Sequence, residues 1–70
     1  MRPTPRFRVG QVVSSYGFGW FTVEKVYWDD GYFYDLREQL SPKLLKMTHP
    51  EVKHEVPEKY VREIAAQVDQ

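Results

Sequence analysis

The sequence predicts a mainly β domain, a small antiparallel barrel with a short helical insert and a C-terminal helix. Three features support this prediction. Aromatic and β-branched residues recur with a period of two in several short segments, as they do in strands with one buried face. Turns that contain glycine separate these segments, and two later segments begin with a proline and continue with helical spacing. At 70 residues, the chain is long enough for one small domain.

The chain is expected to begin with an extended basic arm over residues 1–6. Pro3 and Pro5 fix the backbone angle φ and push the residues before them out of the helical region. We expect the single folded domain to span residues 7–70. Its first strand should begin with Phe7 and Val9 on one face.

The segment WFTVEKVYW gives the strongest strand prediction, because it is rich in β-branched and aromatic residues. Phe21 and Val23 share one face of this strand. Val26 and Trp28 also share a face, but they are out of phase with the first pair by one residue. This shift predicts a β-bulge near residues 24–25, which would bend the strand.

Turns are expected on both sides of that strand. A glycine-containing loop should precede it at residues 16–19, and Asp-Asp-Gly at residues 29–31 predicts a tight hairpin. The strand after the hairpin should turn Tyr32 and Leu36 inward, which leaves Phe33 on the outer face.

Two helices are expected in the second half of the chain. Ser41 is a suitable N-cap for a short helix over residues 42–47, and a last short strand should follow it. Pro57 then opens a predicted helix over residues 57–68. The apolar residues that recur there at helical spacing are Tyr60, Val61, Ile64, Ala65 and Val68.

The predicted core combines the inward positions of all these elements. Its members are Phe7, Val9, Val23, Val26, Trp28, Tyr34, Leu36, Val56, Tyr60, Val61 and Ile64.

The segments FRVGQVV, VEKVYWDDGYFYDL and EVPEKYV resemble the Src-homology-3-like barrel group, in particular its Tudor-like and KOW-like modules. The resemblance covers about residues 7–37 and 52–61 and implies a small barrel. It does not imply one activity, because many unrelated modules share this shape. The start VGQVV is also similar to the plasmid-borne trimethoprim-resistant dihydrofolate reductases, but their Val-Gln-Ile-Tyr active segment has no counterpart here.

No catalytic pattern is present, so we expect a protein that is not an enzyme and holds no cofactor or metal. The chain has no cysteine and no phosphate-binding loop, and His49 and His54 are not spaced as a zinc pair on one helical face. It also lacks an apolar run of signal-peptide or membrane-span length, which makes the cytoplasm the expected compartment.

The first functional hypothesis is a protein-interaction module that acts as an adaptor, an inhibitor or a small subunit. Aromatic grooves bordered by acids suit extended peptides that are basic or rich in proline. The candidate binding residues are Tyr16, Phe18, Trp20, Phe33, Tyr32, Glu24, Asp29 and Asp30. Exposed aromatic residues could instead be covered in a homodimer.

The alternative hypothesis is a nucleic-acid-binding accessory protein. Arg2, Arg6 and Arg8 of the arm would contact phosphates, and bases would stack on Trp20 or Phe18. The formal net charge of zero and the acids near the aromatic residues count against this hypothesis.

Overall fold

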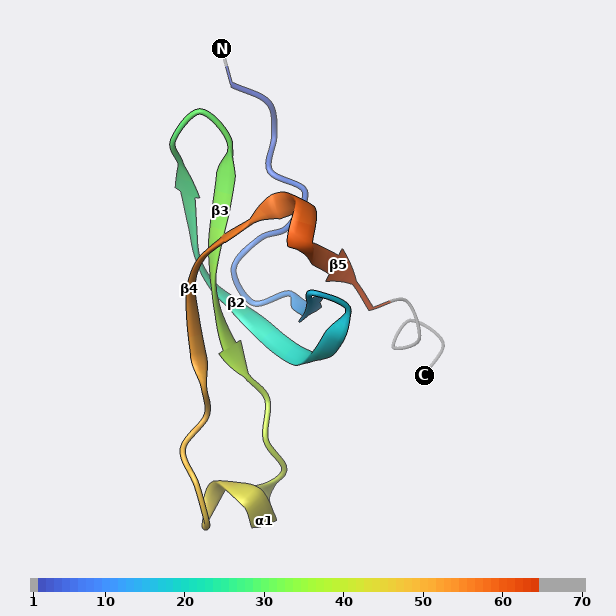
Figure 1. Ribbon diagram of the computed structural model, residues 1–70, viewed down its shortest axis with the longest axis vertical. Helices are drawn as coiled ribbons and strands as arrows, with labels where there is room; N and C mark the ends of the chain where they lie inside the picture. Colours follow the sequence, from blue (N-terminus) through green and yellow to red (C-terminus); the bar gives the residue numbers. More distant parts are fainter. Residues whose placement is uncertain (1, 65–70) are drawn as a thin grey trace.

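The computed structural model describes residues 2–64, which form one antiparallel sheet of five strands in the order β4-β3-β2-β1-β5 (Figure 1). The strands are β1 (Val12–Ser15), β2 (Phe18–Trp28), β3 (Tyr32–Glu38), β4 (Val52–Pro57) and β5 (Val61–Glu63). The prediction of a mainly β, antiparallel fold is confirmed. The prediction of a closed barrel is wrong, because β4 and β5 are the two edges of an open, strongly curved sheet.

The long strand β2 is bent, as predicted, at a β-bulge. Its pairing with β3 shifts register between Val23 and Lys25, so that Glu24 is the extra residue. The first part of β2 pairs with β1 and its whole second part pairs with β3. The bend therefore lets one strand contribute to both halves of the curved sheet.

Both turns that flank β2 use positive φ angles. Asp30 has a φ of 56° in the predicted hairpin, where the Asp29 N–H donates to the Gly31 carbonyl at 2.9 Å. The turn between β1 and β2 consists of Tyr16 and Gly17, with φ of 56° and 80°. It is shorter than the expected loop, because Phe18 already belongs to β2.

The short helix α1 (Pro42–Leu45) has the predicted start. The Ser41 hydroxyl accepts a hydrogen bond from the Leu44 N–H at 3.3 Å, and Pro42 occupies the first turn. The helix is one turn long, all its residues are exposed, and it lies at the end of the molecule far from the N-terminal arm (Figure 1).

The core lies on the concave side of the sheet and contains Phe7, Val13, Phe21, Val23, Tyr34, Leu36, Val56 and Val61. Three predicted core residues are wrong: Val9 is 64% exposed, and Trp28 and Tyr60 are each more than a third exposed. Val9 leaves the core because the chain turns at residues 8–11, where the Gln11 N–H donates to the Arg8 carbonyl, so the first strand begins only at Val12. Val26 packs at the margin of the core and Ile64 is half-buried.

The predicted C-terminal helix is also wrong over the part that the structure describes. Pro57 ends β4, a single 3-10 turn η1 (Glu58–Tyr60) follows, and β5 then pairs with β1. This pairing provides hydrogen-bond partners for the backbone groups along the free edge of β1, and it buries Val61 beside Ser15. Residues 65–68 of the predicted helix lie outside the described residues.

Candidate functional site

The structure does not bring the predicted binding residues together on one surface. Tyr16, Phe18 and Trp20 lie at the start of β2 or in the turn before it. The other aromatic and acidic candidates lie at the opposite end of β2: Asp29, Asp30, Tyr32 and Phe33. Between the two ends, the Glu24 carboxylate is occupied by an ion pair with the Arg37 guanidinium.

A platform of two aromatic rings forms at the β2–β3 hairpin. Trp28 and Tyr32 pair across the hairpin with ring centroids 4.8 Å apart and an interplanar angle of 65°. The N-terminal arm lies on this platform: the Arg2 guanidinium is 6.0 Å from the Trp28 ring centroid, and the Tyr32 hydroxyl donates to the Pro3 carbonyl at 2.6 Å. The arm is therefore bound to the sheet through both a cation–π contact and a hydrogen bond.

Further along the arm, the carboxylate of Glu58 receives two hydrogen bonds. Its Oε2 atom accepts from the Arg6 N–H at 3.1 Å and from the Tyr34 hydroxyl at 2.6 Å. The Tyr34 oxygen in turn accepts from the Phe7 N–H at 3.4 Å, and the two rings meet edge to face at 5.5 Å. Burial and the bond to Glu58 both raise the pKa of Tyr34 above its usual range.

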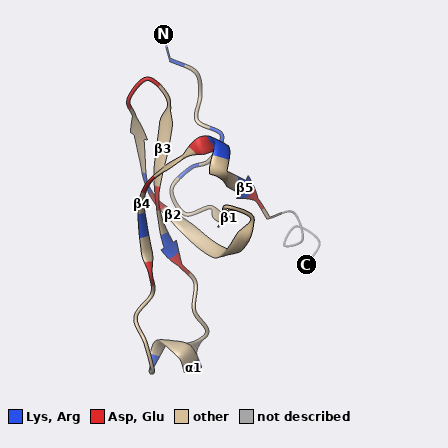
Figure 2. Cartoon of the chain, viewed as in Figure 1, with Lys and Arg blue, Asp and Glu red and all other residues tan. Residues whose placement is uncertain are grey.

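We call the part of the surface that the arm contacts, formed by Trp28, Tyr32 and Glu58, the arm groove. Asp29 and Asp30 of the β2–β3 turn directly follow Trp28, and Figure 2 shows this acidic turn at the same end of the molecule as the N-terminal segment. Of the predicted binding residues, Tyr32, Asp29 and Asp30 lie at this groove. Trp28 and Glu58 were missed, although the Arg-Pro-Thr-Pro-Arg sequence of the arm has the chemistry of a ligand for such a groove.

A second aromatic cluster joins the β1–β2 turn to η1. Tyr16 and Tyr60 stack with centroids 4.7 Å apart, and the ammonium groups of Lys53 and Lys59 lie over them at 5.4 and 5.1 Å, respectively. Phe18, which is 78% exposed, alternates with the inward-facing residues of β2 and has no such partner among the described residues. The Tyr16–Tyr60 pair therefore adjoins basic rather than acidic side chains.

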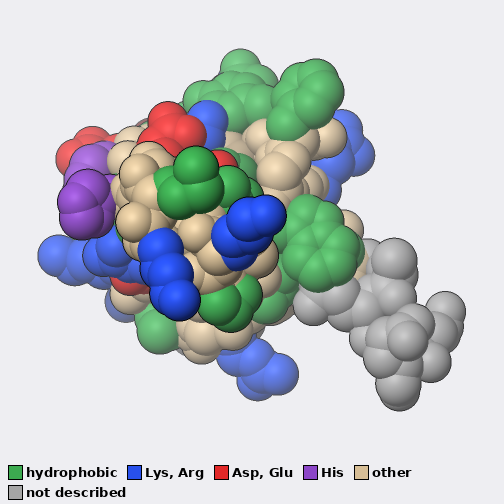
Figure 3. All heavy atoms as spheres, turned by 90° about the horizontal axis from the view of Figure 1, so that it is seen from below, with side chains coloured by type: hydrophobic (Ala, Val, Ile, Leu, Met, Phe, Trp, Pro, Cys, Tyr) green, Lys and Arg blue, Asp and Glu red, His purple; other side chains and the backbone are tan. Residues whose placement is uncertain are grey.

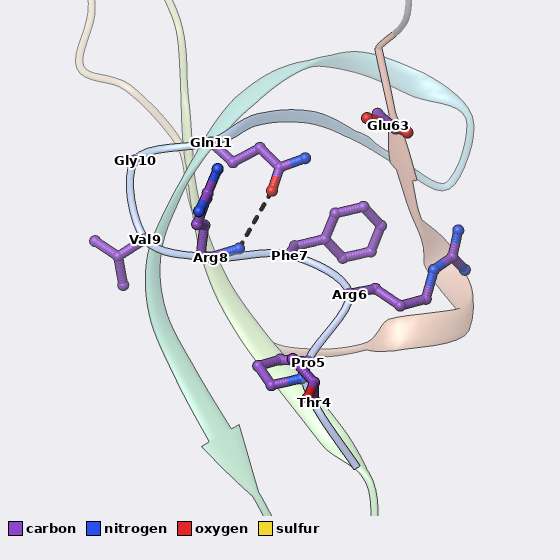
Figure 4. A pocket seen from close by; sticks show the side chains of 9 residues that line it. All are labelled: Thr4, Pro5, Arg6, Phe7, Arg8, Val9, Gly10, Gln11 and Glu63. Atoms are coloured by element: carbon purple, nitrogen blue, oxygen red, sulfur yellow. Dashed lines mark hydrogen bonds between the residues drawn. The ribbon is translucent and has the colours of Figure 1, made fainter.

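Two open cavities meet beneath the arm. One, of about 820 Å³, is lined by the arm and the turn after it, including Arg6, Arg8 and Gln11, with Glu63 of β5 opposite (Figure 4). The other, of about 410 Å³, is lined by Arg6, Lys59, Val61, Arg62 and Glu63. Because they share Arg6 and Glu63, we treat them as one surface, the basic cavity, with Arg6, Arg8, Lys59 and Arg62 as its cations.

The outer face of the sheet carries a hydrogen-bonded carboxylate, that of Asp35 in β3. Asp35 is only 8% exposed, and it accepts from the Tyr27 hydroxyl at 2.5 Å and the Glu55 N–H at 3.0 Å, with His54 Nδ1 at 3.3 Å. Burial would raise the pKa of Asp35, but these hydrogen bonds outweigh it and lower the pKa. The Asp35 carboxylate thus stabilises the β-bulge of β4 at Glu55, whose φ is 53°.

The α1 end of the molecule offers no continuous apolar face. Leu44, Leu45 and Met47 are exposed, but Figure 3 shows hydrophobic and basic side chains interspersed at this end. Within residues 2–64, no group of three or more side chains is arranged to bind a metal ion. In the same part of the chain, every helix is too short to cross a bilayer.

Comparison of the chain with protein-family models, with curated proteins and with solved structures gives no match.

Proposed function

We propose that the protein is a non-enzymatic interaction module with a Src-homology-3-like fold, and that its arm groove binds an extended, basic, proline-containing segment of a partner protein. The observation that supports this function best is the occupant of the groove, which is the chain's own Arg-Pro arm. The bent β2 and the five-stranded antiparallel order support the fold.

The contacts of the arm explain which partner chemistry the groove would select. Prolines hold a chain extended before it binds, so little conformational entropy is lost on binding. The exposed face of Trp28 favours a guanidinium, the Tyr32 hydroxyl needs a carbonyl acceptor, and the Glu58 carboxylate needs an N–H donor. An acidic segment lacks the guanidinium, and a helical segment has most of its carbonyl and N–H groups bonded internally, so neither would satisfy all three requirements.

A partner segment must displace the arm, whose effective concentration at the groove is of the order of millimolar for so short a connection. We therefore expect Arg2→Ala to help an external peptide. Loss of the cation–π contact weakens the arm by about 0.5–1 kcal/mol, which corresponds to about two- to fivefold tighter peptide binding. Arg8→Ala is the matched control, because it removes the same charge outside the groove.

The test uses the full chain and a fluorescently labelled peptide of residues 1–6, followed by anisotropy. Trp28→Ala should abolish binding. Tyr32→Phe removes a hydroxyl that the competing arm uses as well, so it should weaken peptide binding by at most about two- to twelvefold. Phe18→Ala should have no effect. Undiminished binding to both the Trp28→Ala and the Tyr32→Phe proteins would exclude the arm groove as the peptide site.

A further inference from the structure

We propose that the basic cavity is a separate binding site for a single strand of nucleic acid. This inference does not depend on the peptide function, because the ligand and the surface are different. The arm contributes Arg6 and the turn after it contributes Arg8 (Figure 4), while η1 and β5 contribute Lys59 and Arg62, so residues about 50 positions apart in sequence line one surface.

The four cations of the basic cavity are free to meet an anion. Within residues 2–64, the ion pairs are Arg37 with Glu24 and His54 with Asp35, and neither involves the cavity. Two carboxylates lie nearby. Glu63 lines the cavity, and Glu58 already accepts from the Arg6 N–H and the Tyr34 hydroxyl. The positive charges of the cavity therefore exceed the negative ones, although the formal charge of the whole chain is zero.

The backbone that carries Arg6 and Arg8 is held in place before any ligand binds. Arg6 and Arg8 flank Phe7, whose ring is buried in the core, and the Arg8 N–H donates to the Gln11 side chain at 3.3 Å (Figure 4). Little backbone ordering is then needed when phosphates bind.

Aromatic rings at the margin of the cavity favour a nucleic acid strand over a small anion. Lys59, which lines the cavity, precedes Tyr60, and the Tyr60 ring stacks on Tyr16. Both rings are more than a third exposed. When the exposed Lys59 side chain moves from the Tyr60 ring to a phosphate, it vacates a ring surface on which a base can stack.

The acids that counted against nucleic acid in the sequence are remote from this cavity. Asp29 and Asp30 lie in the β2–β3 turn, Glu24 is paired with Arg37, and none of these three lines either cavity. Repulsion of the phosphate backbone by these acids is therefore small at η1 and β5, where the strand would lie.

The experiment measures the fluorescence anisotropy of a labelled oligo-dT of about 12 nucleotides with the full chain; this length is within the ~4–16 nucleotides that one OB fold covers. Four phosphate contacts predict a slope of about −2.8 for log K against log salt, or about a 50-fold loss of affinity between ~50 and ~200 mM salt. Arg6→Ala with Arg8→Ala should halve the slope to about −1.4. Lys43→Ala with Lys46→Ala on α1 removes the same charge far from the cavity and should leave the slope unchanged.

Stacking is tested separately at Tyr60. Tyr60→Ala should lower the affinity at least about fivefold without changing the salt slope, and Tyr60→Phe should retain it. The proposal is wrong if no binding occurs at ~50 mM salt, or if the α1 pair weakens binding as much as the arm pair. It is also wrong if inorganic pyrophosphate competes with the oligonucleotide at equal phosphate concentration, because the site would then recognise a small anion.

Discussion

The hydroxyl of Tyr34 connects the arm, the core and η1, so Tyr34→Phe is an informative perturbation. The substitution keeps the buried ring and its contact with Phe7, but it removes the bond to the Glu58 carboxylate and the acceptor for the Phe7 N–H. A hydrogen bond to a charged group contributes about 1.5–3 kcal/mol. Because Glu58 is half-buried, water can replace part of that bond, and the 3.4 Å contact with Phe7 is weak. We expect a loss of about 2 kcal/mol in the free energy of unfolding.

This loss is large for so small a protein. Domains have unfolding free energies of about 0.05–0.15 kcal/mol per residue, which gives about 3.5–10 kcal/mol for 70 residues. Urea unfolding followed by tryptophan fluorescence measures it. Tyr16→Phe is the control, because Tyr16 is half exposed and its hydroxyl has no hydrogen bond within residues 2–64. If the two variants agree within about 0.5 kcal/mol, Tyr34 does not connect the arm to the core.

Three further predictions concern single sites. In Gly19→Ala, the new methyl group would lie 2.9 Å from the Phe21 ring, and residue 19 would keep a φ of +73°, which alanine rarely adopts. The free energy of unfolding, measured in urea, should therefore be about 1–3 kcal/mol lower than in the native chain. Gly17→Ala has open space and a similar φ, so its smaller loss isolates the clash. Folding lowers the pKa of Asp35, so the ionised carboxylate stabilises the fold above about pH 4, and this stabilisation is lost as the pH falls through the folded-state pKa. The free energy of unfolding should therefore change less between pH 7 and pH 3 in Asp35→Asn than in the native protein. The hydrogen bond to Asp35 raises the pKa of Tyr27 to about 12, and ultraviolet titration of Tyr27→Phe should show one late-ionising tyrosine fewer than the native protein, while the late ionisation of Tyr34 remains.

Local backbone chemistry made several elements predictable from the sequence. The phase shift between Val23 and Val26 located the bulge in β2, and Asp-Asp-Gly located the hairpin. Ser41 before a proline located the start of α1. In each case, a few neighbouring residues determine the conformation through sterics or one short hydrogen bond, so no knowledge of distant contacts is needed.

The C-terminal segment could not be predicted in the same way. The apolar residues Tyr60, Val61 and Ile64 fit helical spacing, but the free edge of β1 offers backbone pairing that a helix would leave unused. Val61 is buried by that pairing, whereas Tyr60 turns outward to stack on Tyr16. A contact between residues about 45 positions apart overrode the local pattern.

Trp28 illustrates why the candidate site could be predicted only in part. In a closed barrel, the concave end of β2 would be covered by the sheet itself, and Trp28 would be a core residue. In the open sheet, the arm covers this end instead, and the Trp28 ring contacts the Arg2 guanidinium. Tyr32 and the acidic turn, which the sequence suggested as binding residues, lie at this end of the sheet, but what surrounds them depends on a closure that the sequence does not encode locally.

Phe7 determines how the two proposed sites relate to each other. Its ring is 2% exposed and belongs to the core, so the arm cannot separate from the sheet beyond this residue without exposing the core. A partner peptide can therefore displace Arg2 and Pro3 from the arm groove, whereas Arg8 stays held on the other side of Phe7 by Gln11. Arg6 connects the two surfaces, because its N–H donates to Glu58 of the arm groove and the residue lines the basic cavity. The arm is thus divided into a displaceable outer part and a fixed inner part, and peptide binding should weaken the basic cavity without abolishing it.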